Sequence, residues 1–232
     1  MNEFNENSTN TANDIAEETI VKNKKNTFDL KKEVFEWIYT IVVALVIAFF
    51  IKAFIFDIVR VDGPSMNPTL IHNDRLIITK LGYEPQSGDI VILDSTYKNR
   101  ENYYKSLEEN GEGLNKFQKV MKYFSLPDSL KKRYYVKRVI ALPGQTVDIK
   151  DGKVYVDDML LEEEYYDGIT TRTDPAVEYP VTVEDDCIFV MGDNRPESLD
   201  SRSQRLGQVP IDAVLGKAQI RLLPVSKFGF VD

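Results

Sequence analysis

Residues 37–56 form a strongly apolar run, WIYTIVVALVIAFFIKAFIF, in which Lys52 is the only charged residue. A helix rises about 1.5 Å per residue, so a run of this length crosses the roughly 30 Å hydrocarbon layer of a bilayer. Trp37 and Lys52 lie near its two ends, where an aromatic ring and a snorkelling ammonium suit the interfaces. A buried core helix is the alternative. The run predicts a transmembrane helix over residues 37–56, followed by one substantial domain, 57–232.

Basic residues gather before the predicted span, at Lys22, Lys24, Lys25, Lys31 and Lys32. Because lysine and arginine favour the cytoplasmic side, they predict a single-pass protein of the cell membrane. Its N-terminus is expected in the cytoplasm and residues 57–232 on the outer face. Residues 1–36 are predicted to be a disordered cytoplasmic tail, since the first 28 are rich in Asn, Thr, Glu and Lys. The apolar run comes too late and is too long for a cleavable export signal.

The charge balance and the scarcity of histidine and cysteine exclude several function classes. A net charge of -8 offers no basic footprint for phosphate backbones, so no nucleic-acid partner is expected. His72 is the only histidine, which excludes sites built from several histidines. Cys187 is the only cysteine and cannot form an intramolecular disulfide; we expect it to be a buried apolar residue.

The outer region reads as short β-branched and aromatic runs separated by turn residues. The predicted strands are 57–61, 75–80, 89–93, 134–141, 145–150, 153–157 and 187–191. Asp151 and Gly152 between two of these runs are a strong hairpin signal. The pattern is typical of an antiparallel, mostly β domain of sandwich or barrel type.

Residues 96–133 lack strand alternation and are predicted to be a helical insertion. Leu114, Phe117, Met121 and Phe124 recur at helical spacing with lysines between them. Two roles fit this pattern. The insertion either covers part of the β core or lies on anionic lipid beside the span.

A serine stands between two prolines in the stretch DGPSMNPTL, residues 62–70. Pro64 and Pro68 each fix φ near -65° and remove a backbone donor, so this stretch is neither regular helix nor inner strand. A rigid exposed turn suits a preorganised nucleophile. Serine is also common in turns without any catalytic role. Ser65 is therefore a candidate nucleophile or a simple turn residue.

A serine nucleophile needs a group that takes its proton, and without a histidine the candidates are carboxylates or a desolvated lysine. His72 lies in the surface-like run IHNDR, where an exposed histidine without a catalytic role is the better interpretation. Lys137, in YYVKRVIALPG, shares a strand face with apolar residues that disfavour its ammonium form. Arg138 also has apolar neighbours, but arginine is excluded as a base by its pKa. Lys137 can act as base only if its pKa falls well below about 10.4; a surface ion pair is the alternative.

A third polar cluster, MGDNRPESLDSR, follows the predicted strand 187–191. It is either a solvated turn or a source of hydrogen bonds and ion pairs that hold a lysine and shape a cleft.

With these blocks in this order, the chain resembles the type I signal peptidases, membrane-anchored serine proteases that remove signal peptides from exported proteins. The resemblance covers roughly residues 37–225 and rests on PSMNPTL, GDIVIL, YYVKRVIALPG, GDNRPESLDSR and the closing GQVPIDAVLGKAQIRLLP. It implies an antiparallel β-sheet catalytic domain of the signal peptidase type, with Ser65 as nucleophile and Lys137 as general base. The resemblance further implies that Ser198 orients the lysine amine and that Asp200 and Arg202 form a supporting ion pair with Arg138 beside it. Asp193 and Arg195 fall in the same loop. Met66 and Pro68 are implied to shape the Ser65 turn.

The same resemblance implies signal peptides of secreted preproteins as substrates, the lipid bilayer as the place of action, and no metal or organic cofactor. Gly63 stands where some members have a serine that helps bind the oxyanion, so the oxyanion site would depend more on the Ser65 backbone, with any second donor unassigned. Gln145 replaces the usual aspartate of LPGD, for which a local structural effect is expected.

Three alternatives stay open. They are a peptidase dedicated to a narrow substrate set such as pilins, a self-cleaving repressor-type protein, and a non-catalytic membrane-tethered scaffold. The predicted span counts against the repressor type, which is soluble. No oligomeric state is predicted.

Overall fold

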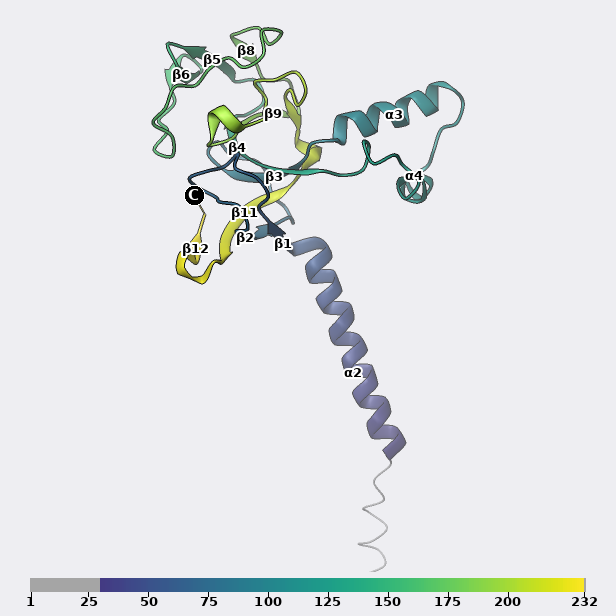
Figure 1. Ribbon diagram of the computed structural model, residues 1–232. Coiled ribbons are helices and arrows are strands. Elements are labelled where there is room, and N and C mark those ends of the chain that lie inside the picture. Colours follow the sequence, from purple (N-terminus) through teal and green to yellow (C-terminus); the bar gives the residue numbers. More distant parts are fainter. Residues whose placement is uncertain (1–29, 232) are drawn as a thin grey trace, which may run out of the picture. The chain divides into compact units, whose positions relative to one another are not determined.

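The computed structural model describes residues 30–231 and divides into two compact units, Met1–Phe50 and Ile51–Asp232. Of the predicted tail, 1–36, residues 1–29 lie outside the described residues. The described part of the first unit is helix α2, Leu30–Phe50 (Figure 1), and its side chains are exposed from residue 31 onward. By length and composition, Lys31–Phe50 could cross a membrane. The helix begins before the predicted boundary at residue 37, because the polar residues there include no proline or glycine that would end it.

The second unit begins with a π-helical turn, η1 (Ile51–Ile55), and the edge strand β1 (Phe56–Arg60). The predicted span ran to residue 56, but Phe56 is already paired with Thr79 of β2. Strand pairing therefore starts where the apolar run ends.

The larger sheet has eight strands in the order β1-β2-β11-β3-β4-β9-β10, with β12 paired to β11. Every pairing in it is antiparallel, so the predicted mostly β, antiparallel fold class is confirmed. Its further strands are β2 (Arg75–Thr79), β3 (Ile90–Asp94), β4 (Tyr134–Ala141), β9 (Cys187–Met191), β10 (Val209–Pro210), β11 (Val214–Leu223) and β12 (Gly229–Phe230).

A smaller sheet of four strands has the order β7-β6-β5-β8 and lies beyond β4 and β9 in Figure 1. Its strands are β5 (Thr146–Lys150), β6 (Lys153–Val156), β7 (Met159–Leu160) and β8 (Val181–Thr182). Asp151 and Gly152 form the predicted hairpin turn with φ of 51° and 77°. Positive φ at both central residues is the geometry that twisted hairpins prefer.

Two apolar clusters hold the sheets and position the site. One joins the two sheets through Ile140, Val147, Val154 and Phe189. The other contains Met66 and Leu70 together with residues of β2 and β3 such as Leu76 and Ile92. Because Met66 and Leu70 are fully buried, the turn that carries Ser65 is fixed to the large sheet.

Residues 96–133 contain two helices, α3 (Tyr97–Glu109) and α4 (Lys116–Tyr123), which extend to one side of the sheets (Figure 1). Arg100 of α3 is buried and bonds Asp94 at 2.5 Å, which attaches the helix to the end of β3. No residue of α4 is buried. The expectation that the insertion covers the β core is therefore wrong for α4. Short 3-10 turns complete the unit at η2 (Arg195–Glu197), η3 (Ile211–Ala213) and η4 (Val225–Lys227).

Candidate active site

The Ser65 turn follows β1 and is held by alternating buried and exposed residues. Met66 and Leu70 point into the core, and the Leu70 N–H donates to the Met66 carbonyl at 2.9 Å. The Asn67 N–H donates to the Pro64 carbonyl at 2.9 Å, which closes the turn around Ser65. The peptide bond before Pro68 is cis. Ser65 is half-buried.

Lys137 lies in β4 and reaches this turn across the end of the sheet. Its Nζ donates a hydrogen bond of 2.8 Å to Ser65 Oγ, although the two residues are 72 positions apart in the sequence. The side chain is 2% exposed, and the ring of Tyr135 has its centre 5.4 Å from Nζ. The structure thus brings together the two residues predicted as nucleophile and base.

The pKa of Lys137 is lowered to about 8, chiefly by burial and to a smaller extent by the nearby charge of Arg202, while the carboxylates of Asp200 and Asp193 act in the opposite direction. An ordinary lysine is neutral to about one part in a thousand near pH 7, whereas a pKa of 8 leaves about a tenth neutral. Desolvation is the dominant cause because the ammonium loses water without gaining a carboxylate partner. This environment provides the lowered pKa that a lysine base requires.

The polar loop 192–202 lies directly behind the Ser65 turn. Gly192 is packed so closely that a Cβ there would clash with Ser198 Oγ and with the Ser65 carbonyl oxygen. Ser198 is therefore close to the turn, as predicted. Its Oγ is buried and forms no hydrogen bond within residues 30–231, so the predicted orientation of the Lys137 amine by Ser198 is not formed in this structure.

Asn194 ties the loop to the nucleophile turn through two hydrogen bonds. Its backbone N–H donates to the Ser65 carbonyl at 3.0 Å, and its Nδ2 donates to the Pro64 carbonyl at 3.1 Å. The sequence placed Asn194 in the polar cluster but gave it no role, since an asparagine in a loop has no distinguishing pattern.

Because the Nδ2 bond to the Pro64 carbonyl helps to fix the position of Ser65, we expect Asn194→Ala, which removes this bond alone, to lower the kcat of peptide cleavage about tenfold, with little change in KM. A loss of this size corresponds to one side-chain hydrogen bond that positions a reacting group. Steady-state kinetics on a peptide substrate measure it. Asn102→Ala, on the exposed surface of α3, is the matched control. An unchanged kcat in Asn194→Ala would show that the turn does not depend on this clamp.

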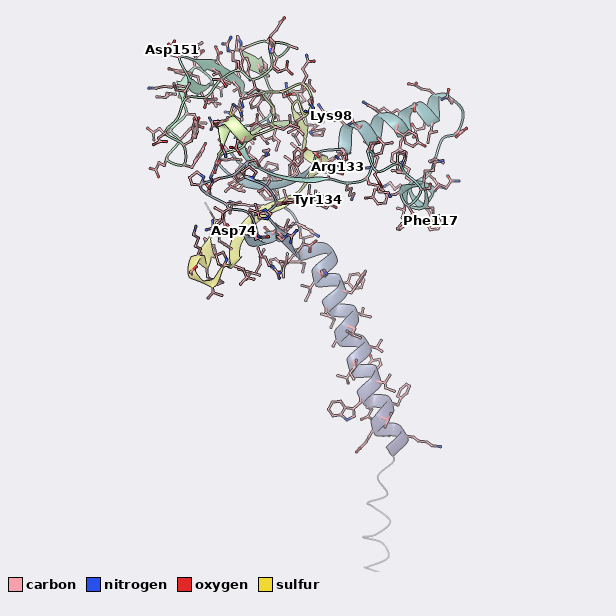
Figure 2. All side chains as sticks on the ribbon, in the orientation of Figure 1. Asp74, Lys98, Phe117, Arg133, Tyr134 and Asp151 are labelled. Carbon is pink, nitrogen blue, oxygen red and sulfur yellow. The ribbon has the colours of Figure 1, made fainter. Side chains whose placement is uncertain are left out.

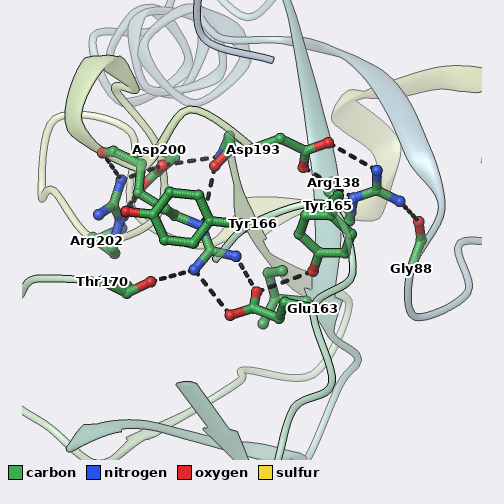
Figure 3. Close-up of polar contacts among 12 residues, drawn as sticks. Gly88, Arg138, Glu163, Tyr165, Tyr166, Thr170, Asp193, Asp200 and Arg202 are labelled. Carbon is green, nitrogen blue, oxygen red and sulfur yellow. Dashed lines mark hydrogen bonds and ion pairs between the residues drawn. The ribbon is translucent and has the colours of Figure 1, made fainter. Parts of the chain in front are cut away.

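Two buried bidentate ion pairs support the loop (Figure 3). Arg202 donates to Asp200 at 2.9 and 2.8 Å, and both side chains are fully buried. Arg138 donates to Asp193 at 2.9 and 2.8 Å and also to the Gly88 carbonyl at 2.8 Å. The predicted Asp200–Arg202 pair is thus formed. Arg138 belongs to a separate pair with Asp193 and extends this support to the end of β4.

Arg195 connects the loop to residues 163–170, which the sequence analysis did not single out. It forms ion-paired hydrogen bonds with Glu163, donates to Thr170 Oγ1 at 2.5 Å and stacks over the Tyr166 ring (Figure 3). Its Nε donates to the Gly192 carbonyl at 3.1 Å. The run EEEYYD contains Glu163 and Tyr166, but a run of acidic and aromatic residues gives no sign that it meets a buried arginine.

The Ser65 backbone N–H donates to no acceptor within the described range, so it is available to a ligand. The Gly63 N–H is used by His72, whose Nδ1 accepts it at 3.3 Å, and the same Nδ1 lies 3.2 Å from Asp62. His72 makes no hydrogen bond to Ser65 among residues 30–231, so the histidine alternative for the base has no geometric support. A Cβ at Gly63 would meet nothing within 4 Å, so the missing serine hydroxyl leaves open space.

A pocket of about 310 Å³ opens beside Ser65 and Lys137. Its two walls are residues 59–66 and residues 134–137, with Glu197 and Leu199 at one end. Along the described strands, β1 is an edge strand and Tyr134–Lys137 pair only with β3, so both walls have a backbone edge without a partner. Residues 30–231 contain no group of His, Cys, Asp or Glu that could hold a metal ion. The arrangement fits an extended peptide.

The family model "Signal peptidase, peptidase S26" matches residues 34–223. A probable signal peptidase I-2 of Synechocystis is 34% identical over 200 residues, covering 83% of this chain and 74% of that protein. Signal peptidase I of Bacillus licheniformis is 33% identical over 222 residues (90% and 96%), and signal peptidase I S of Bacillus subtilis strain 168 is 34% identical over 216 residues (88% and 97%). A crystal structure of a signal peptidase I from Enterococcus faecalis V583 matches 59% of this chain and 98% of its own, at 25% identity and a TM-score of 0.39.

Proposed function

Since this chain belongs to the signal peptidase family, peptidase S26, and is a serine endopeptidase, we propose that it cleaves signal peptides from exported preproteins with a Ser65–Lys137 dyad. The observation that carries this proposal is the 2.8 Å hydrogen bond between Lys137 Nζ and Ser65 Oγ. The lowered pKa of Lys137, about 8, supports it, because a neutral amine is what the chemistry requires.

Catalysis begins when the neutral amine of Lys137 accepts the proton of the Ser65 hydroxyl. Ser65 Oγ attacks the scissile carbonyl carbon, and the carbonyl electrons move to its oxygen. The Ser65 N–H, which has no other acceptor in the described part of the chain, is the proposed donor to the developing oxyanion. The Lys137 ammonium then returns the proton to the leaving amine, the C–N bond breaks, and an acyl-enzyme remains. Water then attacks the acyl carbon while the Lys137 amine takes its proton; the bond between the acyl carbon and Ser65 Oγ breaks, and the ammonium returns the proton to Ser65 Oγ, which releases the new carboxyl terminus and restores the neutral amine.

The loop 192–202 holds this dyad in place. Gly192 lets the Ser65 carbonyl and Ser198 approach closely, and the Asp200–Arg202 pair fixes the loop from behind. Ser198 Oγ is the proposed partner for the amine, because it is buried beside the same turn and forms no other hydrogen bond within residues 30–231.

The substrate lies as an extended strand in the pocket beside Ser65. The unpaired edge of Tyr134–Lys137 offers backbone hydrogen bonds, and residues 59–63 provide the second wall. Recognition of this kind depends on main-chain bonds, with side-chain pockets adding selectivity. Resemblance to the family implies small residues at the first and third positions before the cut.

Helix α2 anchors the enzyme in the cell membrane as a single span. The basic residues that precede it favour an N-terminus in the cytoplasm and a peptidase domain, 57–232, on the outer face. The substrate's own signal segment lies in the same bilayer, so anchoring raises the effective concentration of the cut site near Ser65.

Purified full-length protein in detergent should cleave a model preprotein at its signal-peptide junction, as read by mass spectrometry of the mature N-terminus. Ser65→Ala should abolish this cleavage, because Ser65 is the only hydroxyl that Lys137 Nζ hydrogen-bonds within residues 30–231. Ser129→Ala, on the exposed surface, is the matched control. Cleavage that persists in Ser65→Ala would overturn the nucleophile. A folded but inactive wild type, tested on several unrelated preproteins, would favour a dedicated substrate set or a scaffold.

A further inference from the structure

Helix α4 has an apolar stripe that no described part of the chain covers. Phe117, Val120, Met121 and Phe124 recur at helical spacing and are exposed by 72%, 58%, 57% and 74%. Phe117 lies toward the end of the helical arm away from the sheets (Figure 2). Single exposed apolar side chains are ordinary, but a contiguous row of large ones along one helix face marks a binding surface.

The opposite side of α4 is fixed to its neighbours. The Tyr104 hydroxyl of α3 donates to the Lys119 carbonyl at 3.3 Å, and the Lys119 ammonium lies 3.4 Å from Glu108. The Tyr123 hydroxyl accepts the Lys132 N–H at 3.2 Å. A capping box between Asn115 and Gln118 stabilises the start of the helix. The stripe is therefore held outward by specific contacts.

The residues around the stripe are mostly basic, although the protein as a whole is acidic. Residues 114–133 include six basic residues and one acidic residue, Asp128, in a chain with net charge -8. Lys119 and Lys131 pair with Glu108 and Asp128. The other four of these six basic residues form no ion pair within residues 30–231; they are Lys116, Lys122, Lys132 and Arg133. An anionic partner complements this charge.

We propose that α4 docks on the surface of a bilayer rich in anionic lipid, with the stripe of Phe117, Val120, Met121 and Phe124 in the interface and the unpaired lysines on lipid phosphates. A short basic amphipathic helix binds lipid through buried apolar area plus attraction to anionic headgroups. The inference rests on the proposed membrane anchoring, which raises the effective concentration of helix α4 near lipid. Even a helix of eight residues can bind under this condition. A second copy of the chain fits less well as the partner, because a symmetric contact between two stripes would also bring together the basic residues that surround each of them.

The test uses the full chain with Cys187→Ala, reconstituted into vesicles that contain brominated lipid, and a fluorophore on one introduced cysteine. Met121→Cys reports on the stripe, Glu109→Cys on the polar surface of α3, and Val43→Cys on the proposed span. We expect bromine to quench the label at Met121→Cys in vesicles of equal parts phosphatidylglycerol and phosphatidylcholine, and much less in phosphatidylcholine alone. The label at Glu109→Cys stays unquenched in both.

Adding Lys116→Glu and Lys122→Glu should reduce quenching at Met121→Cys, since each basic residue removed near an anionic surface lowers binding about fivefold. Unchanged circular dichroism shows that these variants fold. An unquenched Met121→Cys label beside a quenched Val43→Cys label would overturn lipid docking while anchoring stands. An unquenched Val43→Cys label would overturn the proposed membrane anchoring. In that case, quenching at Met121→Cys would still show whether helix α4 docks on lipid. A Met121→Cys label that responds only to added protein would assign the stripe to a second copy and overturn the inference.

Discussion

Lys137→Met is expected to lower kcat/KM for signal-peptide cleavage by about 10²- to 10⁴-fold, the contribution that a positioned general base makes. Methionine keeps the length and apolar contacts of the lysine stem but cannot accept a proton. Cleavage of a fluorogenic peptide at fixed pH measures the effect. Lys153→Met, at an exposed position of β6, should retain wild-type activity.

The same substitution should raise stability while it removes activity. Burying an ammonium costs free energy below its pKa, so Lys137→Met is expected to raise the free energy of unfolding at pH 7 by about 1–3 kcal/mol. In the wild type, the folded protein binds fewer protons than the unfolded chain between pH about 8 and 10.5, so stability rises with pH across that window. Lys137→Met should remove this rise. Denaturant unfolding at several pH values tests both statements, and a marked loss of stability would mean that Lys137 is a structural residue.

Asp200→Ala should destabilise the peptidase domain by about 3–5 kcal/mol and abolish cleavage. Both side chains of the Asp200–Arg202 pair are fully buried, so removing one partner leaves an uncompensated charge in the interior. Asp200 also accepts the Gly192 N–H at 3.1 Å, which holds the loop against Ser65. Urea unfolding gives the stability change, and peptide cleavage at low temperature gives the activity of the folded fraction.

Two further variants separate pairing from packing. Asp200→Ala combined with Arg202→Met should regain part of the lost stability, because the unpaired charge is gone. Asp128→Ala breaks an exposed pair with Lys131 and should leave unfolding unchanged. Equal losses in the single and double Asp200 variants would mean that the charge of Arg202 is not the cause.

Most strands of the fold follow from local pattern, but the longest does not. Strand β4 was predicted at its observed limits because aromatic and β-branched residues lie on both sides of Lys137 and Arg138, and the hairpin at Asp151–Gly152 depends on two adjacent residues alone. Strand β11 (Val214–Leu223) is central to the large sheet but has three register shifts, which break the period of two. Gly216 allows a close approach to the Thr79 carbonyl, where a Cβ would clash. Such a strand is recognisable only from its partners.

The chemistry of the residues narrowed the site but did not assign it. Arginine was excluded as a base by its pKa, which left Lys137 as the candidate base on its strand, and the prolines marked the turn at Ser65; the roles of nucleophile and base came from the resemblance to the signal peptidases. The partners of Arg138 and Arg195 were not predictable, since Asp193 and Glu163 come from distant loops that meet only in the folded domain. Asn194 likewise acts through contacts that depend on tertiary packing.

The pH dependence of kcat/KM between pH 6 and 10 tests most directly whether Lys137 is the base. Only the neutral amine can accept the Ser65 proton, so the rate should rise tenfold per pH unit in the acidic range and level off above pH about 8. An inflection near 10.5, the ordinary value for lysine, or a rate that does not change between pH 6 and 9 would contradict catalysis by a desolvated Lys137.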